Sequence, residues 1–202
     1  MDQSVAIVET YLRLNGYFTV TEFPVVERPE NAKYRTATDL DILAVRFPEA
    51  RRSVPGEGRE PAHPPFSLDP ALGVHTDEID MIVGEVKESS AEFNSAGLRL
   101  DVLGAALARF GCCPADAASP LVERLVREGR TKTHSGHLLR MVAFGGKVSG
   151  PASYLQIPLG HVLDFVLVHV REHWEVMSRV QSKDPALGLM ILMEKLRRGT
   201  GA

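Results

Sequence analysis

Two stretches with β-strand character carry acidic side chains at positions where a buried strand would ordinarily carry apolar ones. They read Thr-Asp-Leu-Asp-Ile-Leu-Ala-Val over residues 38–45 and Met-Ile-Val-Gly-Glu-Val-Lys over residues 81–87. Side chains two apart on a strand point to the same face of the sheet. We therefore expect Asp41 on one face of the first strand, and Glu85 together with Lys87 on one face of the second. The alternate positions are apolar and are expected to face a core: Leu40, Ile42, Ala44, Ile82, Gly84 and Val86.

If these two strands are neighbours, the carboxylates of Asp41 and Glu85 lie close together and raise each other's pKa by repulsion. A divalent cation would relieve that repulsion. Carboxylate oxygens are hard ligands that suit Mg²⁺ or Mn²⁺, with water and a substrate phosphate completing the coordination. Lys87 would then lie beside the metal-bound water, where it would orient the water or stabilise charge developing at phosphorus.

A third acidic residue, Glu9, occupies the same helical stripe as Val5, Val8 and Leu12 in a helix expected over residues 2–15. A charged side chain on an apolar stripe needs a partner or a route to water. Two alternatives stay open. Glu9 faces inward towards the strand carboxylates, or it lies at the margin of the stripe with its carboxylate in solvent.

The elements that would position these side chains alternate between helices and strands. We expect helices over residues 2–15, 98–110, 119–128, 161–180 and 185–197, and strands over residues 17–27, 38–47, 79–88, 137–144 and 153–157. Pro24 favours an edge position for the first strand, Ser119 is expected to cap the third helix, and residues 145–147 are expected to form a turn. Three consecutive strands flanked by helices predict a mixed sheet with helices on both faces.

The chain of 202 residues is long enough for one well-filled core, and we expect a single domain over residues 1–202. Residues 48–78 are rich in proline, glycine and charge and predict a long loop or insertion. Such a segment is either a flexible flap near the site or an insertion without a role. Residues 159–198 are expected to form a helical C-terminal segment.

Composition and charge narrow the classes of function. With 44% hydrophobic and 24% charged residues, the chain resembles an ordinary globular protein. A net charge of −3 argues against a broad surface that coats nucleic acid, but it leaves room for a local basic groove. The adjacent cysteines, Cys112 and Cys113, are expected to be reduced thiols. No signal peptide or membrane span is evident, and we expect a cytoplasmic protein.

The order of these motifs resembles the PD-(D/E)xK nuclease superfamily, in particular Holliday-junction resolvases and Mrr-type restriction enzymes. The resemblance rests on a helix with Glu9, a strand, a strand with Asp41, a strand with Glu85-Val86-Lys87, and a further helix. This sequence departs from the family pattern in having Leu40 where the motif has proline, and in the length of the segment between the two acidic strands.

The resemblance implies an α/β fold with a restriction-endonuclease-like mixed central sheet flanked by helices, and additional C-terminal helices. It implies an Mg²⁺- or Mn²⁺-dependent endodeoxyribonuclease that hydrolyses DNA phosphodiester bonds, in duplex or branched DNA, through a metal-activated water. It also assigns roles to residues: Asp41 and Glu85 as metal ligands with the Val86 carbonyl as a third, Lys87 at the water or scissile phosphate, and Glu9 as an auxiliary acid.

Two further expectations remain open. The first is a non-catalytic module with the same fold that binds nucleic acid or a protein partner. The second is a homodimer, because many such enzymes cut two strands with two sites, and the helix that carries Trp174 is where we expect its interface.

Overall fold

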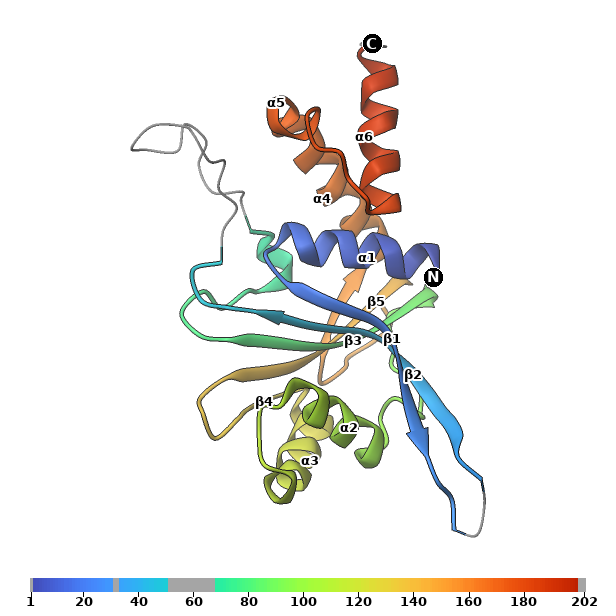
Figure 1. The fold of residues 1–202 in the computed structure, drawn as a ribbon, viewed down its shortest axis with the longest axis vertical. Helices are drawn as coiled ribbons and strands as arrows, with labels where there is room; N and C mark the ends of the chain where they lie inside the picture. Colours follow the sequence, from blue (N-terminus) through green and yellow to red (C-terminus); the bar gives the residue numbers. More distant parts are fainter. Residues whose placement is uncertain (1, 31–32, 51–67, 200–202) are drawn as a thin grey trace.

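A mixed β-sheet with helices on both faces forms the centre of the molecule (Figure 1). A computed structural model describes residues 2–30, 33–50 and 68–199, and within them the sheet has six strands. The strands are β1 (Phe18–Glu27), β2 (Arg35–Arg46), β3 (Asp80–Ser90), β4 (Arg130–Lys132), β5 (Leu138–Lys147) and β6 (Leu155–Pro158). Their order is β1-β2-β3-β5-β4, and β6 pairs with β5. The expected mixed sheet flanked by helices is therefore confirmed.

Strand directions explain why the sheet is mixed. The pairs β1–β2, β2–β3 and β4–β5 are antiparallel, whereas β3–β5 and β5–β6 are parallel. The parallel pair β3–β5 requires a crossover, which the helices between these strands provide. β1 lies at one edge of the sheet, so Pro24 has the edge position expected for it.

Helices lie on both faces of the sheet, as Figure 1 shows. On one side are α1 (Gln3–Leu14) and α4 (Leu159–Glu172), and beyond them, farther from the sheet, α5 (Trp174–Met177) and α6 (Pro185–Arg197), with α6 packed on α1 and α4. On the other side are α2 (Leu100–Phe110) and α3 (Ala118–Glu128). Two short 3₁₀ helices are η1 (Pro70–Leu72) and η2 (Ala115–Ala117). Within the described residues no helix has both the length and the apolar character that crossing a bilayer requires.

Alternation along β2 and β3 builds two cores, one under each helical layer. Ile42 and Ile82 belong to the cluster that includes α1 and α4, whereas Leu43 and Val83 belong to the cluster under α2 and α3. The expected apolar face is thus confirmed for most of its residues. Leu40 is the exception, because it packs in the cluster of α2 and α3. The side chains of β2 therefore change their phase between Leu40 and Leu43.

Two helix expectations need correction. The helix expected over residues 161–180 ends at Glu172, where His173 leaves the helical conformation with φ −102° and ψ 31°. The break redirects α5 so that Met177 is fully buried. Ser119 does not cap α3, because η2 precedes the helix and shifts its start to Ala118.

The turn expected at residues 145–147 is also wrong, because β5 continues through Gly145 and Gly146 to Lys147. A Cβ atom on Gly145 would lie 2.2 Å from the backbone nitrogen of Ala91, and one on Gly146 would lie 2.2 Å from the carbonyl oxygen of Glu88. These glycines are therefore not turn residues. They allow the end of β3 and the chain after it to lie directly against β5.

The short strand β4, three residues long, was not expected from the sequence.

The long loop expected over residues 48–78 is described only in part. Residues 51–67, and with them the flap expected there, lie outside the described residues. The described part contains η1, in which Leu72 is fully buried.

The close approach of backbone to Gly145 leaves no room for a side chain there. Gly145→Ala should lower the free energy of unfolding by at least about 2 kcal/mol, because a backbone atom has to move to make room for the methyl group. Gly104→Ala in α2 is the matched control, since its Cβ would meet nothing within 4 Å. It should be neutral or stabilise by about 0.5–1 kcal/mol. Urea unfolding of both variants tests this, and equal stability would contradict the role given to Gly145.

Candidate metal centre

The acidic strands separate from each other at the position of the candidate residues. β2 and β3 pair from Arg46↔Asp80 as far as Ile42↔Gly84. Beyond that pair β2 continues against β1, and β3 continues against β5. Asp41 and Glu85 are the first residues past the last β2–β3 pair. The two carboxylates thus stand on opposite branches of a fork in the sheet.

The side chain of Asp41 connects the two strands where they separate. Its Oδ2 accepts a hydrogen bond from the backbone N–H of Val86 at 2.8 Å. Burial raises the pKa of the Asp41 carboxyl, while the Val86 N–H acts in the opposite direction. The nearby charges of Asp2 and Asp39 also raise the pKa, and that of Lys87 lowers it. Asp41 is therefore a half-buried carboxylate in an acidic neighbourhood.

Glu85 is more deeply buried, with 3% of its surface exposed. Its Oε1 accepts a hydrogen bond from Asn94 Nδ2 at 2.7 Å and lies 3.8 Å from Lys87 Nζ. Burial raises the pKa of its carboxyl from the usual 4.5 to about 7, and the charge of Asp41 adds to the shift, whereas Lys87 and Asn94 oppose it. Glu85 is thus only partly ionised near neutral pH.

The second oxygen of Glu85 has a different environment. Oε2 is buried and has no hydrogen-bond partner among the described residues. A buried carboxylate oxygen without a partner costs free energy unless a cation or a proton satisfies it. The donor set of Asp41 and Glu85 consists of hard oxygen atoms, which fit Mg²⁺ or Mn²⁺. The carbonyl of Val86, the residue directly after Glu85 on β3, would add a third oxygen of the same kind.

Lys87 contacts the Asp41–Glu85 pair through Glu85, whereas the contacts of Glu9 are with other residues. Lys87 shares a strand face with Glu85, as expected, and its side chain is 32% exposed, so it can reach both the carboxylate and solvent. Glu9 is buried on α1, where its Oε1 accepts hydrogen bonds from Arg13 at 2.6 Å and Thr19 at 2.9 Å. Glu9 is thus buried, but these contacts do not show it facing the strand carboxylates, so its role as an auxiliary acid stays a prediction. The partners recorded for it among the described residues are Arg13 and Thr19.

Asn94 is a residue that the sequence reading missed. It lies in the loop between β3 and α2 and reaches back to Glu85. Its spacing to Gly97 is typical of a turn in which an Asn side chain accepts a backbone N–H. That signal predicts the turn but not the contact with Glu85, which depends on how the loop folds onto the sheet.

A separate group of possible metal-binding side chains lies on the chain just before β3. His75, Asp77 and Glu78 can bring one ligand atom each within 4.8 Å of one another. Glu78 is already paired with Lys132, whose Nζ lies 2.7 Å from its Oε2. His75 and Asp77 are exposed. This group therefore lacks the burial and the unsatisfied oxygen that distinguish Glu85.

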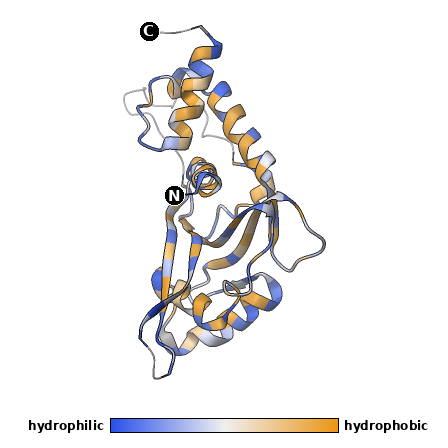
Figure 2. Cartoon of the chain, turned by 90° about the vertical axis from the view of Figure 1, so that its right-hand side faces the viewer, coloured by the Kyte–Doolittle hydropathy of each residue, from blue (hydrophilic) through white to orange (hydrophobic). Residues whose placement is uncertain are grey.

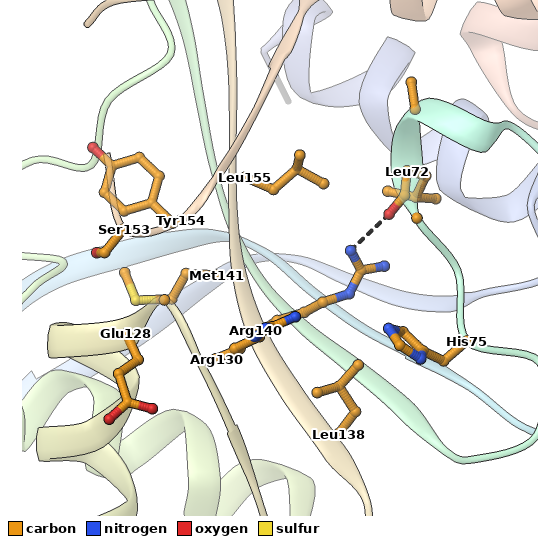
Figure 3. Close-up of a pocket in the computed structure, with 13 residues that line it drawn as sticks. Leu72, His75, Glu128, Arg130, Leu138, Arg140, Met141, Ser153, Tyr154 and Leu155 are labelled. Carbon is orange, nitrogen blue, oxygen red and sulfur yellow. Dashed lines mark hydrogen bonds between the residues drawn. The ribbon is translucent and has the colours of Figure 1, made fainter. Parts of the chain in front are cut away.

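A cavity of about 550 Å³ lies near the beginning of β5, at the opposite end of the β3–β5 pair from the fork (Figure 3). Arg140 enters it, but its guanidinium donates to the Leu72 carbonyl at 2.7 Å, to Tyr17, and to both oxygens of Asp80. These hydrogen bonds occupy the guanidinium within the fold. Arg140 is therefore a structural residue.

Comparisons with known proteins add no assignment. No protein-family model matches the chain, and neither a curated protein nor a solved structure matches it.

The raised pKa of Glu85 predicts a specific dependence of stability on pH. Between pH 4.5 and 7 the folded state holds the Glu85 proton more tightly than the unfolded chain does. The resulting stabilisation is complete below pH 4.5 and is lost as pH rises through about 7. Glu85→Gln removes this titration, so the variant should gain stability relative to wild type as pH rises across the window.

Urea unfolding at several pH values in EDTA measures this difference. Glu88→Gln is the matched control for removal of one charge, because Glu88 is exposed on the same strand. A difference between Glu85→Gln and wild type that stays constant from pH 4.5 to 7 would contradict the environment described for Glu85.

Proposed function

We propose that the protein is an Mg²⁺- or Mn²⁺-dependent endodeoxyribonuclease with a restriction-endonuclease-like fold of the PD-(D/E)xK type. The observation that carries the proposal is the fork between β2 and β3, where Asp41, Glu85 and Lys87 meet and where Glu85 Oε2 has no hydrogen-bond partner. The order helix, strand, strand, strand, helix around this fork supports the proposed family, because the resemblance in sequence rests on the same order.

In this proposal Asp41 and Glu85 hold the cation, together with the Val86 carbonyl. When bound, a divalent cation lowers the pKa of a coordinated water and neutralises charge on a phosphate oxygen. Lys87, partly exposed and close to Glu85, donates to the attacking water or to the scissile phosphate. Asp41 has a second task, because the same carboxylate holds the backbone of Val86.

The acidic side chains around the fork support a requirement for a cation in phosphate binding. The negative charges of Asp2 and Asp39 act on Asp41. A phosphate approaching these acidic groups would be repelled. A bound cation inverts the local charge and makes phosphate binding favourable. Duplex or branched DNA is the proposed substrate, and a homodimer with two such sites remains part of the proposal.

A non-catalytic module that binds nucleic acid or a protein partner is the second candidate. The observation that favours it is a row of exposed apolar side chains on α6, along which hydrophobic colour extends in Figure 2. Its members are exposed by 50% to 68% and lie at helical spacing: Leu189, Leu192, Met193 and Leu196. Solvent-facing rows of this kind are typical of surfaces that bind another protein.

Cleavage of labelled linear duplex, single-stranded and four-way-junction DNA with Mg²⁺, Mn²⁺ or EDTA tests the proposal. We expect metal-dependent cutting by the wild type. Glu85→Gln should reduce the rate by a factor on the order of 10³, because a cation ligand is lost. Lys87→Ala should reduce it by about 10²–10³, because a donor to the developing charge is lost.

Glu88→Gln again serves as the control, and it should cut like the wild type. Binding of DNA without cutting on any substrate, in the presence of either metal, would reject the enzyme and favour the binding module. Cutting that survives in Glu85→Gln would point to a contaminating nuclease.

The role of Glu9 is tested separately. Because Glu9 accepts hydrogen bonds from Arg13 and Thr19, Glu9→Gln should lower the free energy of unfolding by about 1–3 kcal/mol. Its cutting rate should stay close to that of the wild type. A fall in rate as large as that of Glu85→Gln, in a variant that remains folded by circular dichroism, would establish Glu9 as the auxiliary acid.

A further inference from the structure

The loop between β3 and α2 brings an amide side chain against Glu85. Asn94 uses both ends of its amide: Nδ2 donates to Glu85 Oε1 at 2.7 Å, and Oδ1 accepts from the backbone N–H of Gly97 at 2.6 Å. The Gly97 N–H can pair only with the oxygen end, so the nitrogen end must face Glu85. The loop thus fixes which end of Asn94 meets the carboxylate.

The position of Asn94 is set by the core and not by solvent. Ala91 is fully buried, and its N–H donates to the Lys147 carbonyl at 2.9 Å. Phe93 is buried, and its N–H donates to Tyr154 Oη at 3.3 Å, with the two rings packed edge to face. The residues just before Asn94 are therefore anchored to β5 and to the segment that leads into β6.

The contact with Asn94 distinguishes the two oxygens of Glu85. Oε1 is engaged by Asn94 and approached by Lys87, whereas Oε2 is buried and has no hydrogen-bond partner among residues 2–30, 33–50 and 68–199. Gly97 borders the space beside Oε2, since a Cβ there would lie 3.4 Å from that oxygen. One oxygen is held by the protein, while the other is buried without a partner among the described residues.

We propose that Asn94 is a positioning residue for the cation site, and that it holds Glu85 so that Oε2 faces the divalent cation. The inference rests on the proposed function, because it requires a cation at the fork. Without Asn94, the Glu85 carboxylate is free to rotate towards Lys87, and binding a cation then costs the free energy of reorienting it. Residues that orient metal ligands typically contribute a factor of about 10–100 to metal affinity.

The test is Mn²⁺ affinity of the full chain without DNA, from the free Mn²⁺ signal in electron paramagnetic resonance. Asn94→Ala removes both hydrogen bonds. Asn94→Ser retains an acceptor for the Gly97 N–H, as serine does at helix N-caps, but is too short to reach Glu85. Both variants should bind Mn²⁺ about 10–100-fold more weakly than wild type. Thermal unfolding should place Asn94→Ser close to wild type and Asn94→Ala below it.

Ser95→Ala, exposed in the same loop, is the matched control and should bind like the wild type. Wild-type affinity in Asn94→Ser, with loss only in Asn94→Ala, would reduce Asn94 to a loop-stabilising residue and overturn the inference. That result leaves the proposed function intact if Glu85→Gln abolishes Mn²⁺ binding. Absence of Mn²⁺ binding by the wild type itself would overturn both the inference and the proposed function.

Discussion

The candidate site depends on the hydrogen bond between the Val86 N–H and the Asp41 side chain. Where β2 leaves β3, the backbone of β3 loses its neighbour on that side, and a buried N–H without an acceptor is costly. The Asp41 carboxylate supplies the acceptor at 2.8 Å. The same contact places Asp41 next to Glu85. One hydrogen bond therefore both satisfies the Val86 N–H where the strands separate and positions Asp41 beside Glu85.

The other side of the site depends on how closely β3 and its following loop approach β5. Gly145 and Gly146 have no side chains, so the chain from Glu88 to Ala91 lies directly on β5. Because of this approach, the loop between β3 and α2 folds onto the sheet and Asn94 contacts Glu85. The parallel β3–β5 pair thus does more than complete the sheet, because it positions the groups that surround the buried carboxylate.

Sequence periodicity was sufficient to locate the long strands and most of the helices, because each buries one face in a core, but it did not show the break at His173. The bounds predicted for α6, 185–197, match the structure, in which Asp184 caps the helix and Pro185 is its first residue. The three residues of β4 are too few to show a period. Gly145 was misread because a glycine that admits a neighbouring backbone has the same local signature as a turn glycine. The shared face of Glu85 and Lys87 was predictable from alternation. The position of Asp41, where β2 changes phase, and the contacts of Asn94 and Glu9 depend on tertiary structure.

The most direct test of a cation site at the fork is a crystal structure of the protein with Mn²⁺, located by anomalous scattering. The account predicts one Mn²⁺ bound by Asp41, the Oε2 oxygen of Glu85 and the Val86 carbonyl, with the Asn94 contact to Oε1 retained. Well-ordered crystals in saturating Mn²⁺ that show no peak at the fork, or a peak only at His75, Asp77 and Glu78, would contradict it.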